Sequence, residues 1–294
     1  MKKHLLLFGL LGLFIMAFTP NPGVNKKKLK VPKGFVYVPS GSLKDGDKTL
    51  SIQGFFMLAT EVSNLDYREF LHHLEAAGRT ADLAKAQVHA EGWRQAAQYN
   101  EPMVEHYHQH PAYENYPVVN ITREGALLYC TWLQEQLQSQ NPDQFIKVRL
   151  PTEQEWMYAA RGGHEDYYYS NGYYLRNNKG EFMYSYRHVG DEYLHTDPKT
   201  GAFERKTIMI SGRPANGVLG NLTAPAQSFV PNDFGLYNMC GNAAEMIAED
   251  GRTKGGSFAD TGYDIRIDGP DTYAGVQEAS PYIGFRVLFS AVGK

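Results

Sequence analysis

Glycine and proline interrupt this sequence so often that no long apolar run occurs after residue 30. The 294 residues include 29 Gly and 15 Pro, residue types that end helices and strands or form turns. This frequency argues against a helical bundle and favours short elements joined by many loops. Because 20 Tyr, 15 Phe and 3 Trp provide large surfaces to bury, we expect a folded rather than a disordered chain.

The N-terminal residues differ in composition from the rest of the chain. Lys2 and Lys3 precede the apolar run LLLFGLLGLFIMAF, which is short for a bilayer span and typical of a signal-peptide core. We predict a signal peptide or an uncleaved signal anchor over residues 1–20 and a basic linker over residues 21–33. Membrane association is expected through residues 1–20 only. No cysteine stands directly after the run as an acceptor for a lipid, so the sequence is not that of a lipoprotein.

The charge of the chain argues against nucleic-acid binding, and its cysteine content leaves the disulfide state open. The formal net charge is −3, which argues against a general nucleic-acid binder, because such proteins carry an excess of basic residues. The chain has two cysteines, Cys130 and Cys240, and a single pair does not define a disulfide framework. Their disulfide state is therefore left open.

Local patterns predict a few elements within one domain. Strands are expected at residues 34–39, 55–58, 255–258 and 283–288, from short apolar or alternating runs. Helices are expected at residues 64–75, after Ser63 or Asn64, and at residues 122–138, with Thr122 as the cap. Thr152 and Glu155 resemble a capping box for a further helix that Gly162 ends. No linker interrupts residues 34–290, so a single domain is expected there.

Segments spread along the chain carry a family resemblance. In their order they resemble the sulfatase-modifying-factor, or formylglycine-generating-enzyme, domain family. The resemblance covers residues 34–290 and implies an α+β, loop-rich single domain related to C-type lectins. The segments are FVYVPSGS, EVSNLDYREF, YPVVNITREGALLYC, RLPTEQEWMYAARGG, PNDFGLYNMCGNAAEM, KGGSF and IGFRV.

Further segments are similar to one branch of that family. YNEPM with HPAYENYPVV, LRNNKGEF, and SPYIGFRVLFSAVGK look like the type IX secretion and gliding-motility proteins of the GldK/PorK and GldJ kind. Those proteins are lipoproteins at the periplasmic face of the outer membrane, and this chain departs from them by lacking a lipidation cysteine. The resemblance implies a periplasmic structural or interaction component, associated with the outer membrane, whose partners are other protein subunits of an envelope assembly.

The resemblance also identifies the positions where the family's oxidase chemistry would occur. Aerobic formylglycine-generating enzymes use two cysteines after the GGS segment to bind copper(I), which prefers soft thiolate ligands. The corresponding residues here are Asp260 and Ile265. A carboxylate and an alkyl group do not replace thiolates in this role, so the sequence predicts a protein without this enzymatic activity and without catalytic residues.

Two other functions compete with the structural one. His106, His108 and His110 would share one face of an extended segment, which favours a metal-dependent oxidase or modifying enzyme with a noncanonical site. Surface or packing roles are the simpler reading of these histidines. The tyrosine-rich residues 167–174 favour a ligand-binding, lectin-like module, although tyrosines also pack in irregular structure.

The resemblance implies a structural calcium ion as the one cofactor. The family pattern provides side chains at Asn238 and Glu245 and carbonyl groups at Gly241 and Ala243, and this chain has suitable residue types at all of these positions. The alternative is that Asn238 and Glu245 bind protein groups directly. Charged residues inside the family motifs are expected to form buried ion pairs that position loops; they are Glu61, Arg149, Glu153, Glu155, Arg161 and Arg286.

Overall fold

The computed structural model describes residues 29–96, 100–187, 191–196, 199–201, 203–208 and 222–293. The predicted signal segment at residues 1–20 and most of the linker at 21–33 lie outside the described residues. Within the described part of the chain, no helix combines the length and the apolar character that a membrane span requires.

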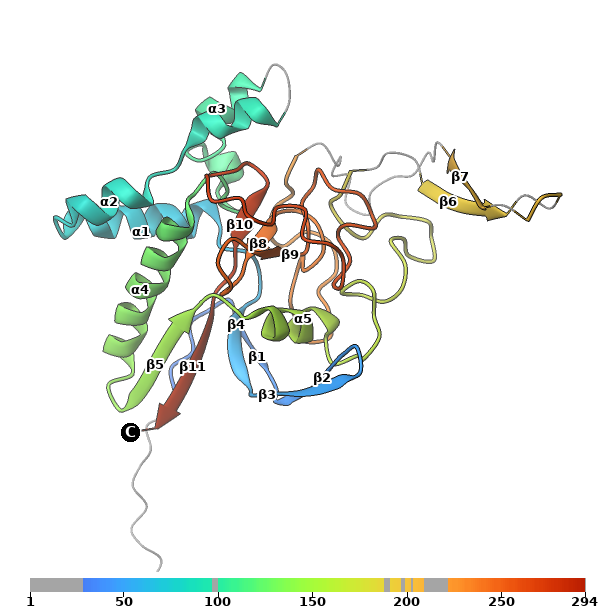
Figure 1. Ribbon diagram of the computed structural model, residues 1–294. Helices are drawn as coiled ribbons and strands as arrows, with labels where there is room; N and C mark the ends of the chain where they lie inside the picture. Colours follow the sequence, from blue (N-terminus) through green and yellow to red (C-terminus); the bar gives the residue numbers. More distant parts are fainter. Residues whose placement is uncertain are drawn as a thin grey trace, which may run out of the picture.

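A four-stranded sheet joins the two ends of the domain (Figure 1). Strand β11 lies between β4 and β5, and each of its pairings is antiparallel. Leu288 of β11 is opposite Met57 on one side and Arg149 on the other. The strands, in sheet order, are β1 (Phe35–Val38), β4 (Phe55–Leu58), β11 (Leu288–Gly293) and β5 (Gln144–Arg149).

Three smaller sheets complete the strand inventory of the described residues. In the three-stranded sheet, β10 pairs in parallel with β8, and β8 pairs antiparallel with β9. The other two sheets are antiparallel hairpins. The bounds are β10 (Ile283–Phe285), β8 (Ala244–Met246), β9 (Thr253–Lys254), β2 (Gly41–Asp45), β3 (Lys48–Ile52), β6 (Asp191–Thr196) and β7 (Phe203–Ile208).

The three longest helices begin at the predicted caps, and the first two end at residues 76 and 140, slightly after their predicted ends. Helix α1 (Asn64–Ala76) is capped by Ser63, and α4 (Arg123–Gln140) is capped by Thr122. Helix α5 (Glu153–Arg161) has the capping box of Thr152 and Glu155, and Gly162 ends it with φ 62°. A side-chain oxygen at each N-cap satisfies a backbone N–H that the helix leaves free, which explains the agreement.

Other elements depart from the sequence prediction. Residues 255–258 do not form a strand, because Gly255 and Gly256 have φ of 88° and 63°, in the left-handed region that extended strands do not use. The segment between α1 and α4 contains short helices, although its apolar residues do not have the spacing that predicts a helix. They are α2 (Thr80–Ala86), η1 (Ala90–Gln95), α3 (Glu101–His106) and η2 (Pro111–Tyr113).

The core consists of three apolar clusters. One cluster surrounds Trp156 of α5, and a second, which includes Phe285 and Trp132, joins α1 and α4 to the sheet. The third is centred on Trp93 and Tyr107, with ring centroids 4.5 Å apart. The short helices η1 and α3 therefore pack around a core of their own, whereas Ala86 of α2 belongs to the second cluster.

Candidate functional site

The residues at the family's cysteine positions have structural roles. The Asp260 carboxylate accepts hydrogen bonds from the Ser257 N–H at 2.7 Å and the Tyr273 hydroxyl at 2.8 Å. Ile265 is fully buried in the core around Trp156. A Cβ atom added to Gly256 would lie 3.0 Å from the Ile265 side chain. The carboxylate thus fixes the loop after the GGS segment, and the isoleucine fills the space beneath it.

The two cysteines occur as free, buried thiols in different clusters. Cys130 lies in the core beside α1 and α4, and Cys240 lies in the core around Trp156. Burial raises the pKa of each thiol to about 12, because a thiolate is poorly solvated in an apolar environment. Neither cysteine therefore provides a thiolate at neutral pH.

Glu245, the carboxylate of the predicted calcium site, is hydrogen-bonded to protein groups. Arg286 donates to it from Nη2 at 2.7 Å and from Nε at 3.1 Å, and the Trp156 indole Nε1 donates at 2.7 Å. Arg286 is fully buried and also donates to the backbone oxygens of Leu58 and Tyr237. Glu245 and Arg286 thus link β8, β4 and the end of β10.

A second buried glutamate completes this group, which we name the Arg286 cluster: Glu61, Asn238, Asn242, Glu245 and Arg286. Asn242 donates to Glu61 at 2.7 Å, and Asn238 donates at 3.4 Å. Arg286 Nη2 lies 4.0 Å from Glu61. Burial raises the Glu61 pKa to about 8 although the Arg286 charge opposes this effect. The expected buried ion pair is present for Arg286, and its partner is Glu245 at 2.7 Å, whereas Glu61 holds its proton at neutral pH.

This arrangement does not fit a calcium site that uses Glu245. Calcium binds carboxylate, amide and backbone carbonyl oxygens, and Glu245, the one carboxylate of the predicted set, is already neutralised by the Arg286 guanidinium. Asn238 directs its amide nitrogen to Glu61 and to the backbone oxygen of Ala226, at 3.0 Å from the latter. Among the described residues, no group of three His, Cys, Asp or Glu side chains could hold a metal ion. Calcium binding at Asn238, Gly241, Ala243 and Glu245 stays a prediction.

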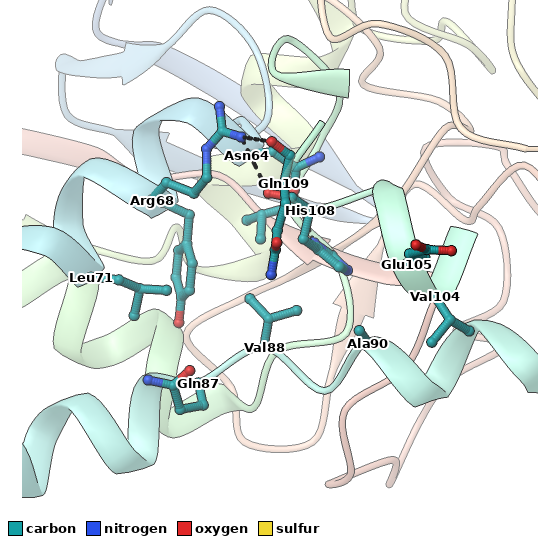
Figure 2. A pocket seen from close by; sticks show the side chains of 12 residues that line it. Asn64, Arg68, Leu71, Gln87, Val88, Ala90, Val104, Glu105, His108 and Gln109 are labelled. Carbon is teal, nitrogen blue, oxygen red and sulfur yellow. Dashed lines mark hydrogen bonds between the residues drawn. The ribbon is translucent and has the colours of Figure 1, made fainter. Parts of the chain in front are cut away.

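The three histidines of EHYHQHPAY do not converge, because α3 ends at His106 and a turn follows it. The rings of His106 and His110 lie 5.9 Å apart, and His108 is separate from them. His106 ends α3 and is exposed, and His110 is exposed and accepts the Ala112 N–H. His108 turns inward and is only 8% exposed. Its Nδ1 lies 3.1 Å from Asn64 Oδ1 (Figure 2). The expectation that alternate residues share one face is therefore wrong here.

The tyrosine-rich residues 167–174 divide into a packed and an exposed part. Tyr169 is buried and donates to the backbone oxygen of Gly262 at 2.9 Å. Tyr174 is 74% exposed, and the Arg266 guanidinium lies 4.3 Å from the ring centre of Tyr168. Packing thus explains one part of this segment, while the other part is exposed to solvent.

The fold and the clusters define a loop-rich α+β domain of the formylglycine-generating-enzyme class. It is similar to solved structures described as the crystal structure of CarF, with a TM-score of 0.54 and 19% identity over 89% of this chain and 99% of the other. It is also similar to PvdO from Pseudomonas aeruginosa, with a TM-score of 0.52 and 16% identity over 87% and 94% of the two chains. At these identities the likeness concerns the fold alone.

Residues 19–291 match the sulfatase-modifying factor enzyme 1-like domain, and the chain belongs to this family. The formylglycine-generating enzyme of Mus musculus is 26% identical over 78% of this chain and 60% of that protein. The inactive C-alpha-formylglycine-generating enzyme 2 of Bos taurus is 29% identical over 45% of this chain and 33% of that protein. The chain therefore spans about a third to three fifths of the length of these curated relatives.

Proposed function

We propose that this protein is a non-catalytic member of its family that works as a structural or interaction component of an envelope assembly. The assembly would be a type IX secretion or gliding-motility apparatus, and the protein would be located in the periplasm, at or near the outer membrane. Its partners would be other protein subunits.

We infer the lack of catalytic activity from the residues of the loop after the GGS segment. Asp260 holds the Ser257 N–H and the Tyr273 hydroxyl, and Ile265 is core. The only cysteines of the chain, Cys130 and Cys240, are buried in separate clusters with raised pKa values. Copper(I) chemistry needs accessible thiolates close together, and these residues offer none.

The envelope part of the proposal is supported by the sequence resemblance. The segments YNEPM with HPAYENYPVV, LRNNKGEF and SPYIGFRVLFSAVGK look like those of gliding-motility proteins, and residues 1–20 have the pattern of an export signal. The relatives that match this chain include one named as a formylglycine-generating enzyme and one named as inactive. The relatives therefore do not decide whether this chain is catalytic, and the proposal rests on its own residues.

An affinity purification tests the assembly role. The tagged full-length protein would be isolated from gently solubilised envelopes and its partners identified by mass spectrometry. Recovery of secretion-machinery subunits in stoichiometric amounts is expected. Recovery of the protein alone, under conditions in which a known complex survives, would overturn the proposal, as would normal secretion and gliding in a deletion strain.

A separate assay tests the non-catalytic part. The purified protein, supplied with copper(I) and oxygen, would be incubated with a sulfatase-derived peptide that contains the substrate cysteine. We expect no formylglycine by mass spectrometry, while an active family enzyme converts the peptide in parallel. If the purified protein still converts the peptide after contaminating enzymes have been removed, it has a catalytic site elsewhere in the domain, and this part of the proposal is wrong.

A further inference from the structure

A pocket of about 350 Å³ lies between α1, the segment that follows α2, and α3 with its following turn. Its volume falls at the lower end of the range of about 300–1,000 Å³ that is usual for small-molecule sites. Aliphatic side chains line much of it, among them Leu71, Val88, Val104 and Val118. Figure 2 shows the His108 imidazole near Val88, with Leu71 on one side of the pocket and Val104 on the other.

The neighbours of Asn64 determine which nitrogen of His108 carries the proton. The Asn64 amide nitrogen donates to the backbone oxygens of Tyr107 and Tyr113, both at 3.0 Å. Two carbonyl partners fix the amide orientation, so Asn64 Oδ1 faces His108 as an acceptor. The Nδ1 atom of His108, 3.1 Å away, must then be the protonated nitrogen. Nε2 is left with a lone pair.

The lone pair of His108 Nε2 has no partner. Nε2 is buried and accepts no hydrogen bond from any residue that the structure describes. Burial also lowers the His108 pKa to about 3, so the imidazole is neutral at physiological pH and keeps this lone pair. A buried acceptor without a donor is costly, and most such atoms in folded proteins are satisfied.

A cation lines the same pocket. Arg68 of α1 donates through Nη1 to the backbone oxygen of Gln109 at 2.7 Å. No carboxylate of the described residues forms an ion pair with Arg68. The fixed guanidinium therefore has donors left for an acidic group. Glu105 also lines the pocket, and its carboxylate lies 3.7 Å from His106 Nε2.

We propose that this pocket binds a small aromatic acid that carries an O–H or N–H donor, such as a phenolic acid. The donor meets His108 Nε2, the ring lies against Val88 and Val104, and the carboxylate faces Arg68. This binding function goes beyond the assembly role and does not depend on it. A water molecule bound to Nε2 is the alternative occupant.

Nuclear magnetic resonance of the full-length protein with ¹⁵N-labelled histidine tests the assignment directly. The probes are 4-hydroxyphenylacetate, phenylacetate, which lacks the donor, and p-cresol, which lacks the carboxylate. We expect 4-hydroxyphenylacetate to shift the His108 Nε2 resonance and to bind about 10- to 100-fold more tightly than phenylacetate, the difference that one buried hydrogen bond gives. If none of the probes shifts this resonance, water is the occupant and the proposal is wrong.

Three variants and one control separate the contributions. Val88→Phe fills the pocket without changing His108 or Asn64, and His108→Phe removes the acceptor; each should abolish the binding of 4-hydroxyphenylacetate. Arg68→Gln should weaken that probe about two- to fivefold and leave p-cresol unchanged. His106→Gln alters an exposed neighbouring histidine and should leave all affinities unchanged. Equal binding by wild type and Val88→Phe would overturn the proposal even if His108→Phe fails to fold.

Discussion

The Arg286 cluster and the His108 pocket both bury polar side chains, and they differ in how these are satisfied. In the cluster, Glu245 receives hydrogen bonds from Arg286 and Trp156, and Glu61 receives them from two asparagines. In the pocket, His108 has one partnered and one unpartnered nitrogen beside empty volume. A saturated polar cluster holds loops together, whereas an unsaturated one has capacity for a ligand.

The largest expected effect comes from removing the charge at the centre of the cluster. Arg286→Met leaves the buried Glu245 carboxylate without its cation, and we expect a loss of about 3–5 kcal/mol in the free energy of unfolding. Denaturant titration measures it. Arg94→Met is the matched control, because Arg94 also pairs with two glutamates but at the surface, and it should leave the stability unchanged. Equal losses in both variants would contradict the role of the cluster.

The Glu61 carboxyl should make stability fall as pH rises. Its pKa of about 8 in the folded state exceeds the ordinary value of 4.5, so between these values the folded state binds more protons than the unfolded state. The stabilisation is complete below about pH 4.5 and is lost as pH approaches about 8. Glu61→Gln should remove this slope from the wild-type profile of unfolding free energy. Parallel profiles for the two proteins would show that Glu61 is ionised when folded.

The His108 imidazole should contribute a slope of the opposite sign. Its folded-state pKa of about 3 lies below the ordinary value of 6.5, so the unfolded state binds more protons between these values. Its contribution is therefore complete above pH 6.5 and is lost as pH falls toward 3. His108→Gln should flatten this acidic limb, whereas His106→Gln should not. A slope that persists in His108→Gln belongs to other groups.

The smallest expected effect is that of calcium. Because Arg286 neutralises Glu245, we expect added calcium or EDTA to leave the melting temperature of the purified protein unchanged. Differential scanning calorimetry measures this directly. A rise with calcium that is absent in Glu245→Gln would support the ligand set that the sequence predicts and contradict the assignment of Glu245 to Arg286 alone.

Local sequence signals such as helix caps predict the main helices, whereas contacts between residues far apart in the sequence are not predicted. Ser63, Thr122 and the Thr152–Glu155 pair act within one helical turn, so a single sequence reveals them. The partner of Glu245 is 41 residues away, and that of Asn64 is 44 residues away. No local pattern encodes such distances. Charges inside motifs did suggest buried ion pairs, but His108 could be distinguished from His106 and His110 only once α3 was seen to end before it.

The position of β11 has a consequence for how the chain reaches its fold. This strand lies between β4 and β5 and follows both of them in the sequence. The central sheet therefore cannot form completely during synthesis until the segment that follows Arg286 has emerged. The pairing of β11 with β4 joins Leu288 to Met57 and so spans most of the chain. Such distant pairings fold slowly. The export that we propose for this chain would benefit from this delay, because a chain that is still unfolded can pass through a channel for unfolded polypeptide.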